Sequence, residues 1–296
     1  MEKLKHTDMN TEKNKVWGGT LYLVATPIGN LSDLSERALK VLSEVDFVAA
    51  EDTRNSGLLL SRFGISKPLV SYYEHNKRER GEYIVSRLEN GESCALVTDA
   101  GMPAISDPGE DIVRLCAEKN VPVTAVPGCC AAVTALALSA LTTGRFAFEG
   151  FLTVNRHDRT ERLISLKNEE RTMIFYEAPH KLLRTLSDML EYLGDRKITL
   201  CREMTKLNEE IIRSTLSEAV RIYSEKAPKG EYVLVVEGGI HDTKSAEWPD
   251  DPEEHVRKYE SAGLSRMDAI KAAAKERGVP KGTLYKQLIS AENKEE

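Results

Sequence analysis

Short apolar runs recur along the first half of the chain, and each ends in a turn or an acidic group. They cover residues 20–25, 45–50, 94–98 and 121–126. Apolar runs of this length, bounded by turn residues, are typical of buried strands. Helical stretches separate them, which predicts a mostly parallel sheet with ligands bound beyond the carboxyl ends of its strands.

Helices are predicted between these strands from the spacing of apolar residues. Asp33, with Glu36 three residues on, is typical of a capping box, and Ala38 and Leu42 give the following helix an apolar face. The longest apolar stretch, residues 129–141, predicts a buried helix, because it is well short of the roughly 20 residues that span a bilayer. We therefore expect no membrane partner.

The pattern breaks at residues 142–145, T-T-G-R, and we place a domain boundary there. Further strands are predicted at 172–176, 198–202, 211–215 and 232–237, with a helix at 181–193. The expected fold class is therefore α/β, with two α/β domains and a small helical extension. The expected divisions are a flexible tail (1–18), an N-terminal domain (19–143), a C-terminal domain (144–240), a linker (241–252) and the helical extension (253–296).

In the extension, Ser265 and Asp268 predict the start of a helix that Gly278 and Pro280 end, and a second helix is expected over 283–289. Two interpretations stay open, a helix-turn-helix module that binds nucleic acid or a solvated helical pair that packs against the body. The local net charge here is +4, because six basic residues outnumber two acidic ones. The basic residues are Arg266, Lys271, Lys275, Arg277, Lys281 and Lys286.

Composition places the 296-residue chain among globular proteins and narrows the chemistry. The net charge is -6, so any nucleic acid must be bound by local basic patches. Five cysteines without a C-x-x-C spacing favour a reducing cytoplasm. No G-x-G-x-x-G, Walker A or G-x-S-x-G pattern occurs, and no His is spaced with a second His or Cys to bind zinc, so a metal is not expected.

The segment D-A-G-M-P-A-I-S-D-P-G, residues 99–109, is the densest group of turn residues in the chain. It follows a predicted strand directly, and it combines two Gly, two Pro and two Asp. Gly allows positive φ and close approach of a ligand, and Pro stiffens the loop. The pattern predicts a special backbone path at the carboxyl end of a strand, where an ordinary crossover loop is the alternative.

Six motifs occur in the order of one known family. They are T-P-I-G-N (26–30), A-E-D-T-R (50–54), the 99–109 segment, V-P-G (126–128), Y-E-A-P-H-K (176–181) and G-E-Y-V-L-V-V-E-G (230–238). The chain resembles the ribosomal RNA small subunit methyltransferase I family of the tetrapyrrole methylase superfamily over residues 19–239 and the helical extension.

The resemblance implies a homodimer whose two α/β domains hold S-adenosylmethionine in the cleft between them. It also implies 2′-O-methylation of cytidine 1402 (Escherichia coli rRNA numbering) in 16S rRNA of the small ribosomal subunit. The residues that it implies for cofactor binding are Pro27, Gly29, Asp99, Gly101, Met102, Ile105, Ser106, Pro127, Gly128, Tyr176, Glu177, Ala178 and Gly230.

Two positions depart from the family pattern. Met102 stands where Thr is usual, and Cys129 and Cys130 replace the more common Pro-Ser after V-P-G. Because cofactor contacts in such loops are largely made by the backbone, we expect both departures to be tolerated.

A ribose hydroxyl is a poor nucleophile until its proton leaves, so a positioned base is expected beside the cofactor. The candidates are Glu51, Asp52, Glu177 and His180, and none is preferred. For the carboxylates, a structural hydrogen bond or an ion pair with Arg54 or Lys181 is the open alternative.

RNA must be held by its phosphates, which favours basic residues near the strand ends. Tyr72 or Tyr73, together with His75, is suited to stack on a base. A solvated helix start is the alternative, because Glu79 and Glu82 dilute the charge. The residues that we expect to contact RNA are Arg54, His75, Lys77, Arg78, Arg80, Arg266, Lys271, Lys275 and Lys281.

Two other functions stay open at this point. One is methylation of a tetrapyrrole carbon or another small molecule by a superfamily relative. The other is a non-catalytic RNA-binding or assembly protein, which would have no need for S-adenosylmethionine.

Overall fold

The computed structural model describes residues 15–239, 249 and 251–292, and the side chains of these residues up to 289. The chain divides into two units, residues 1–239 and 240–296. The expected tail (1–18) and linker (241–252) lie largely outside the described residues. Within the described part, no helix has the length and apolar character needed to cross a bilayer.

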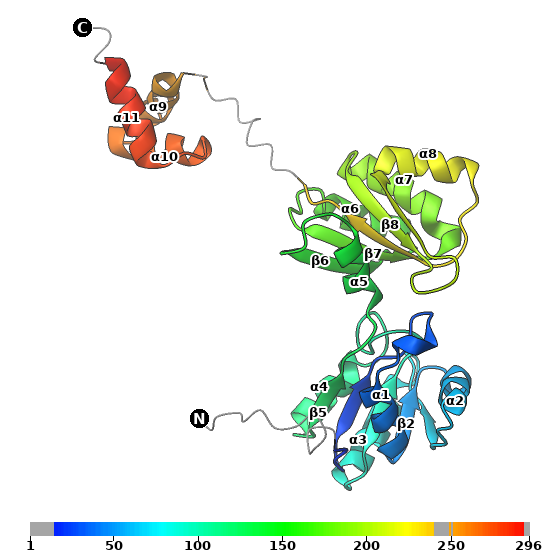
Figure 1. Ribbon diagram of the computed structural model, residues 1–296. Helices are drawn as coiled ribbons and strands as arrows, with labels where there is room; N and C mark the ends of the chain where they lie inside the picture. The colour runs from blue at the N-terminus through cyan, green and yellow to red at the C-terminus, as the bar shows by residue number, and fades with distance from the viewer. Residues whose placement is uncertain (1–14, 240–248, 250, 293–296) are drawn as a thin grey trace. The chain divides into compact units, whose positions relative to one another are not determined.

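The first sheet of residues 1–239 is parallel throughout, as its apolar runs predict. Its strand order is β3-β2-β4-β1-β5, so all five carboxyl ends meet at one edge (Figure 1). Strand β3 was not predicted, because its three residues are only half-buried. The strands are β1 (Leu21–Val24), β2 (Phe47–Ala50), β3 (Leu69–Ser71), β4 (Cys94–Val97) and β5 (Val123–Val126).

Helices cover both faces of this sheet and form two separate apolar clusters with it. The predicted capping box at Asp33 is wrong. Asp33 belongs to the short helix η2 (Leu31–Asp33), and Ser35 caps α1 instead, since its Oγ accepts from Ala38 N at 3.1 Å. The helices are α1 (Glu36–Glu44), α2 (Thr53–Arg62), α3 (Lys77–Glu89) and α4 (Glu110–Glu118).

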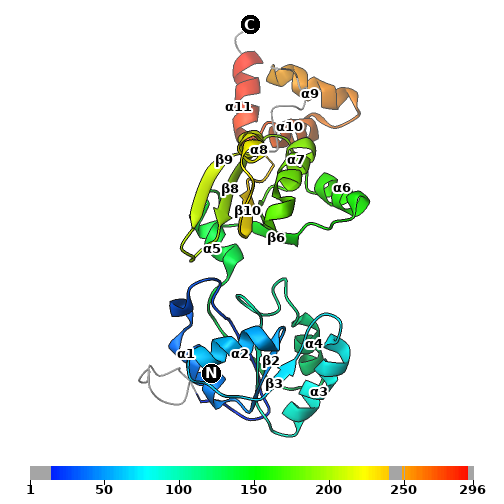
Figure 2. The same cartoon turned by 90° about the vertical axis from the view of Figure 1, so that its right-hand side faces the viewer.

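The second sheet is mixed. Its order is β6-β7-β10-β8-β9, with β6 and β7 parallel and the other neighbours antiparallel (Figure 2). The four predicted strands of this half are confirmed. The strands are β6 (Phe146–Phe151), β7 (Thr172–Glu177), β8 (Lys197–Arg202), β9 (Glu210–Thr215) and β10 (Tyr232–Val236).

The second sheet is covered by helices on both faces. One face packs against α6 (Arg156–Ser165), α7 (Leu182–Leu193) and α8 (Leu216–Glu225), with the turn η3 (Pro179–Lys181) leading into α7. The other face packs against α5 (Ala131–Leu138). Helix α5 is buried on one side only, because Val133 is 52% exposed.

Residues 252–292 form a three-helix unit with an apolar core of its own. The predicted Ser265 cap is confirmed, since Ser265 Oγ accepts from Asp268 N at 3.3 Å. His255 is fully buried, with Arg277 Nε donating to its Nδ1 at 3.0 Å and Glu276 Oε2 lying 2.9 Å from its Nε2. The helices are α9 (Pro252–Ser261), which was not predicted, α10 (Arg266–Glu276) and α11 (Lys281–Glu292).

Candidate cofactor cavity and active site

A backbone pairing joins the loops that follow β1 and β4. Thr26 N donates to Gly101 O at 2.9 Å, and Gly101 N donates to Thr26 O at 3.1 Å. The Thr26 hydroxyl donates to Thr98 O at 3.0 Å. Gly101 has φ of 90°, a value that only glycine adopts without strain. These bonds hold two of the expected cofactor loops against each other.

The 99–109 loop takes the special path that its composition predicts. Ala104 and Ser106 have φ of 67° and 65°, in the left-handed region that non-glycine residues rarely adopt. Gly109 has φ of 152°, and a Cβ there would lie 2.9 Å from the Ala104 Cβ. Strained residues of this kind cost about 1–3 kcal/mol each and collect at functional sites.

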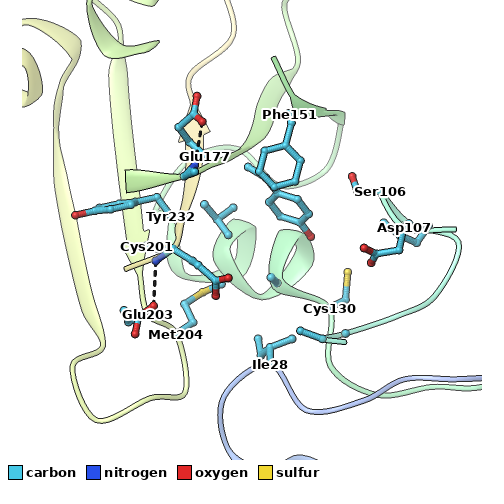
Figure 3. A pocket seen from close by; sticks show the side chains of 18 of the residues that line it. Ile28, Ser106, Asp107, Cys130, Phe151, Glu177, Cys201, Glu203, Met204 and Tyr232 are labelled. Atoms are coloured by element: carbon cyan, nitrogen blue, oxygen red, sulfur yellow. Dashed lines mark hydrogen bonds between the residues drawn. The ribbon is translucent and has the colours of Figure 1, made fainter. Parts of the chain in front are cut away.

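Next to this loop is a cavity of about 280 Å³ (Figure 3). Its walls are mostly apolar, with a few carboxylates and one lysine, which is the usual make-up of a small-molecule site. The lining residues are Ile28, Ala100, Gly101, Met102, Ile105, Ser106, Asp107, Cys130, Ala131, Phe151, Tyr176, Glu177, Ala178, Cys201, Glu203, Met204, Lys206, Glu231, Tyr232 and Val233.

Seven of the thirteen expected cofactor residues line this cavity, namely Gly101, Met102, Ile105, Ser106, Tyr176, Glu177 and Ala178. Pro27, Gly29, Asp99, Pro127, Gly128 and Gly230 do not. The role of all thirteen in binding stays a prediction.

Packing requires glycine at three of the expected cofactor-binding positions, because a Cβ there would lie too close to a neighbouring residue. A Cβ at Gly29 would lie 2.7 Å from Thr205 Oγ1, and one at Gly230 would lie 2.8 Å from Glu203 Oε1. A Cβ at Gly128 would lie 2.9 Å from the Ala25 Cβ. These glycines therefore let neighbouring loops approach, which shapes the cavity without lining it.

The chemistry of the cavity suits S-adenosylmethionine. Ile28, Met102 and Phe151 offer apolar surface to a purine ring, and the Asp107 carboxylate offers a negative charge to the cationic groups of the cofactor. Burial raises the pKa of Tyr176 to about 12, so its phenol stays neutral at physiological pH. Its oxygen accepts from Ala132 N at 3.2 Å, which fixes the ring beside the cavity.

Asp52, one of the four candidate bases, has a structural role. It caps α2 and accepts from Arg54 through N, Nε and Nη2, at 2.8, 3.1 and 2.7 Å. These bonds lower the pKa of Asp52 to about 2. Such a weak base is poorly suited to take a proton, and the ion-pair alternative describes this residue.

Glu177 is also fully engaged. It is 4% exposed, it accepts from Ala178 N at 2.9 Å, and the Thr185 hydroxyl donates to its second oxygen. Arg159, itself buried and paired with Asp188 at 2.6 Å, donates to Thr185. In Figure 3 the Glu177 side chain points away from the cavity, although the residue lines it.

The other two candidate bases, His180 and Glu51, differ in how far they are buried. His180 is exposed, and it is not part of the cavity wall. Glu51 is half-buried at the end of β2, also outside the wall. Burial, and then the charges of Asp99 and Asp52, raise the pKa of Glu51.

Asp107 is a cavity residue that the sequence did not single out, although it lies inside the 99–109 motif. Burial, followed by the charges of Glu51 and Asp99, raises the pKa of Asp107 to about 6. Asp99 is held in turn by Asn55, whose Nδ2 donates to its Oδ2 at 2.8 Å. Three carboxylates from two segments, Glu51 after β2 and Asp99 and Asp107 in the loop after β4, therefore gather at this edge of the first sheet. In the described residues, no group of three or more His, Cys, Asp or Glu side chains is arranged to hold a metal ion.

The expected RNA contacts of the N-terminal half differ in how available they are. Tyr72 is 1% exposed, so the prediction that this residue stacks on a base is wrong, whereas Tyr73 is 40% exposed. Lys77 bonds to Glu74 at 2.8 Å and Asp111 at 2.7 Å, which neutralises it. Those that remain exposed are Arg54, paired with Asp52, and His75, Arg78 and Arg80.

In the helical unit, Arg266 is engaged with Glu253 at 3.1 Å and Glu260 at 3.4 Å. Lys271, Lys275 and Lys281 are exposed, and no carboxylate among the described side chains forms an ion pair with them. These three lysines are therefore the basic groups of the unit best placed to meet a phosphate.

Comparison with known proteins assigns the class first. A family model described as Tetrapyrrole (Corrin/Porphyrin) Methylases matches residues 20–220. A uroporphyrin-III C-methyltransferase from Thermus thermophilus, solved with S-adenyl homocysteine, has a similar fold with a TM-score of 0.53. The two are 16% identical, over 74% of this chain and 97% of that one. The predicted α/β fold with two sheets is thus confirmed as the tetrapyrrole methylase type.

Sequence relatives then narrow the class. A protein named ribosomal RNA small subunit methyltransferase I from Synechocystis is 44% identical, covering 93% of this chain and 99% of that protein. One of the same name from Halalkalibacterium halodurans is 48% identical, covering 90% and 93%. The chain therefore belongs to the ribosomal RNA small subunit methyltransferase I family, as its six motifs predict.

The raised pKa of Asp107 makes a prediction about stability. A carboxyl whose pKa is raised on folding stabilises the protein fully below its unfolded value near 3.8, and that contribution is lost as pH rises through about 6. Asp107→Asn removes the titrating group, so the variant should unfold at a higher temperature than the wild type at pH 7.5. The difference should shrink toward pH 4. Calorimetric scans at both pH values test this, and a variant with lower Tm at pH 7.5 contradicts it.

Proposed function

We propose that this methyltransferase transfers the methyl group of S-adenosylmethionine to the 2′-oxygen of a cytidine ribose in 16S rRNA, at position 1402 in Escherichia coli numbering. The observation that carries the proposal is the similarity to proteins of this name over more than nine-tenths of the chain. The cavity supports it, because its apolar walls and the Asp107 carboxylate suit the chemistry of the cofactor. Since this substrate is ribosomal, we place the protein in the cytoplasm.

When bound, the cofactor supplies a methyl group on a positively charged sulfur, which is displaced in line by the ribose oxygen. Positive charge is dispersed in such a displacement, so alignment of the reactants carries much of the acceleration. The paired Thr26 and Gly101 loops and the strained 99–109 loop provide a rigid wall for this alignment. Phe151 and Tyr176, whose ring centroids lie 5.5 Å apart in an edge-to-face arrangement, provide an aromatic part of the wall.

Methyl transfer from labelled S-adenosylmethionine to small ribosomal subunits that lack the modification tests the function. We expect label on one cytidine ribose of the decoding region, found by nuclease mapping. Free 16S rRNA, assayed in parallel, shows whether the assembled subunit is required. Label on a tetrapyrrole but not on RNA would contradict the proposal in favour of a small-molecule acceptor, and no label despite cofactor binding would contradict it as well.

We also propose that the helical unit contacts RNA through its exposed lysines. Replacing Lys271, Lys275 and Lys281 together by Gln should weaken RNA binding and flatten its salt dependence. The slope should fall by up to about 0.7 for each single-strand phosphate that the variant no longer neutralises. Affinity for S-adenosylmethionine should not change, because the cavity lies in the other unit.

A matched control replaces Lys167, Lys226 and Lys229, three exposed lysines outside the helical unit, by Gln. It removes the same charge from the chain and should leave the salt slope as in the wild type. RNA affinity is measured by filter binding over a series of salt concentrations. If both triple variants weaken RNA binding equally, the proposal is contradicted, because the loss then follows from the lower net charge of the chain and not from the helical unit.

We propose further that two copies of the chain associate, with β6 at the contact. This strand is an edge of the second sheet, and Phe146 and Val154 beside it are 41% and 67% exposed. Exposed apolar edges are rarely left uncovered. Sedimentation equilibrium should show a dimer that Val154→Asp dissociates and Leu58→Asp, at an exposed site on α2, does not. A wild-type monomer at micromolar concentration contradicts this proposal.

A further inference from the structure

A chain of buried hydrogen bonds runs from α6 through α7 to the end of β7. Arg159, which is 4% exposed, lies on α6, and its Nη2 donates to Thr185 Oγ1 at 2.7 Å. Thr185 is 1% exposed and lies on α7, and its hydroxyl donates to Glu177 Oε2. The other oxygen of Glu177 accepts from Ala178 N at 2.9 Å. Three side chains from three elements are thus joined to backbone that lines the cavity.

The chemistry of the three side chains fixes the direction of this chain. A guanidinium only donates hydrogen bonds and an ionised carboxylate only accepts them, whereas a hydroxyl has one proton to give. Because Arg159 donates to the Thr185 oxygen, the Thr185 proton must point to another group. Glu177 Oε2 and, at 3.1 Å, Lys181 O lie within its reach. Hydrogen bonds in a chain polarise one another, so Arg159 both orients and strengthens the bond from Thr185 to Glu177.

Arg159 is itself held in place by a second partner on α7. Its Nε donates to Asp188 Oδ2 at 2.6 Å, three residues along the helix from Thr185. A planar guanidinium that bonds through two of its nitrogens cannot turn without breaking one of the bonds. The pairing also balances the positive charge, which would be costly to bury alone. Arg159 is therefore a fixed donor.

The other end of the chain closes the turn after β7. Figure 3 shows the Glu177 side chain pointing away from the cavity, so this carboxylate acts on the turn from behind. Ala178 N is bonded to Glu177, and Ala178 O accepts from Lys181 N at 3.0 Å. Both polar backbone groups of Ala178 are thus held by neighbouring groups of the chain. Residues 176–178, which line the cavity, are therefore fixed before a ligand arrives.

We propose that Arg159 is a positioning residue for cofactor binding, and that it acts through Thr185 and Glu177 on the backbone of residues 176–178. The inference rests on the proposed function, which places this segment against S-adenosylmethionine, and deepens it. Arg159 is not part of the cavity wall, so its effect must be transmitted through the chain of hydrogen bonds. With the chain intact, the segment loses little freedom when the cofactor binds. When the chain is broken, ordering the turn opposes binding.

Two substitutions of Thr185 test the proposal. Thr185→Val keeps the shape of the side chain but has no proton to give, so Glu177 loses a donor. The Kd for S-adenosylmethionine, measured by calorimetry, should rise about tenfold, as expected for the loss of a hydrogen bond to a charged group. Thr185→Ser keeps the hydroxyl and should bind the cofactor within a few-fold of the wild type. The single-turnover rate of methyl transfer at saturating cofactor should change little in either variant, because the chain acts on binding.

A double-mutant cycle tests whether Arg159 acts through Thr185. Arg159→Met removes the first donor and should also weaken cofactor binding, though less than Thr185→Val, because the Thr185 proton is then free to turn to Lys181 O. The double variant should bind the cofactor like Thr185→Val alone. Independent effects would add in free energy, so a Kd raised by the product of the two single effects would overturn the proposal.

Two control variants separate this role from general stability. Leu186→Ala removes a fully buried side chain from the same helix and core, and should lower Tm without weakening cofactor binding at temperatures well below Tm. Ser187→Ala removes a hydroxyl that donates to Leu183 O at 2.9 Å on the exposed side of α7, and should leave the Kd unchanged.

Two results would overturn the proposal. One is wild-type affinity for the cofactor in Thr185→Val. The other is a loss of affinity in Leu186→Ala as large as in Thr185→Val, which would reduce the role of the chain to stability. Failure of the proposed function is a different result, because the wild type itself would then place no label on RNA.

Discussion

The cofactor cavity depends on one backbone constraint, the pairing of Thr26 with Gly101. Two hydrogen bonds across this pair fix the point where the loops after β1 and β4 leave the parallel sheet. From there the 99–109 loop passes through two left-handed non-glycine residues, which cost about 1–3 kcal/mol each. That cost is sustained only because the sheet beneath the loop is rigid and buried. The same rigidity gives the cavity wall its fixed shape.

The pKa values of the carboxyl groups at this edge of the first sheet depend on their surroundings as well as on residue type. Asp52 and Asp107 are the same residue type, yet their pKa values lie at about 2 and about 6. Arg54 bonds to the first, while the second is half-buried beside Glu51 and Asp99 and has no donor among the described residues. A cavity for a cationic cofactor benefits from this contrast, because Asp52 positions a helix while Asp107 lines the cavity.

The second sheet contributes through packing as well as chemistry. Helix α5 follows a strand of the first sheet in the chain but packs its buried side against β7 and β10. Gly29 and Gly230 allow close approach to the loop after β8, where Lys206 joins Glu203 and Glu231. Substitutions at these glycines therefore act on the shape of the cavity, and weaker cofactor binding would not by itself prove direct contact.

The sequence by itself determined the α/β class, the family, the strands with long apolar runs and the special path of the loop after β4, because all of these depend on local patterns. It could not identify Ser35 as the cap of α1, since Asp33 has Glu36 three residues on, as a capping box requires, whereas Ser35 has Ala38. Only the tertiary structure decided the burial of Tyr72 and the environment of Asp107, which is set in part by Glu51, 56 positions earlier in the chain. Burial and charge act through space over a few ångströms, whereas a motif records only order along the chain.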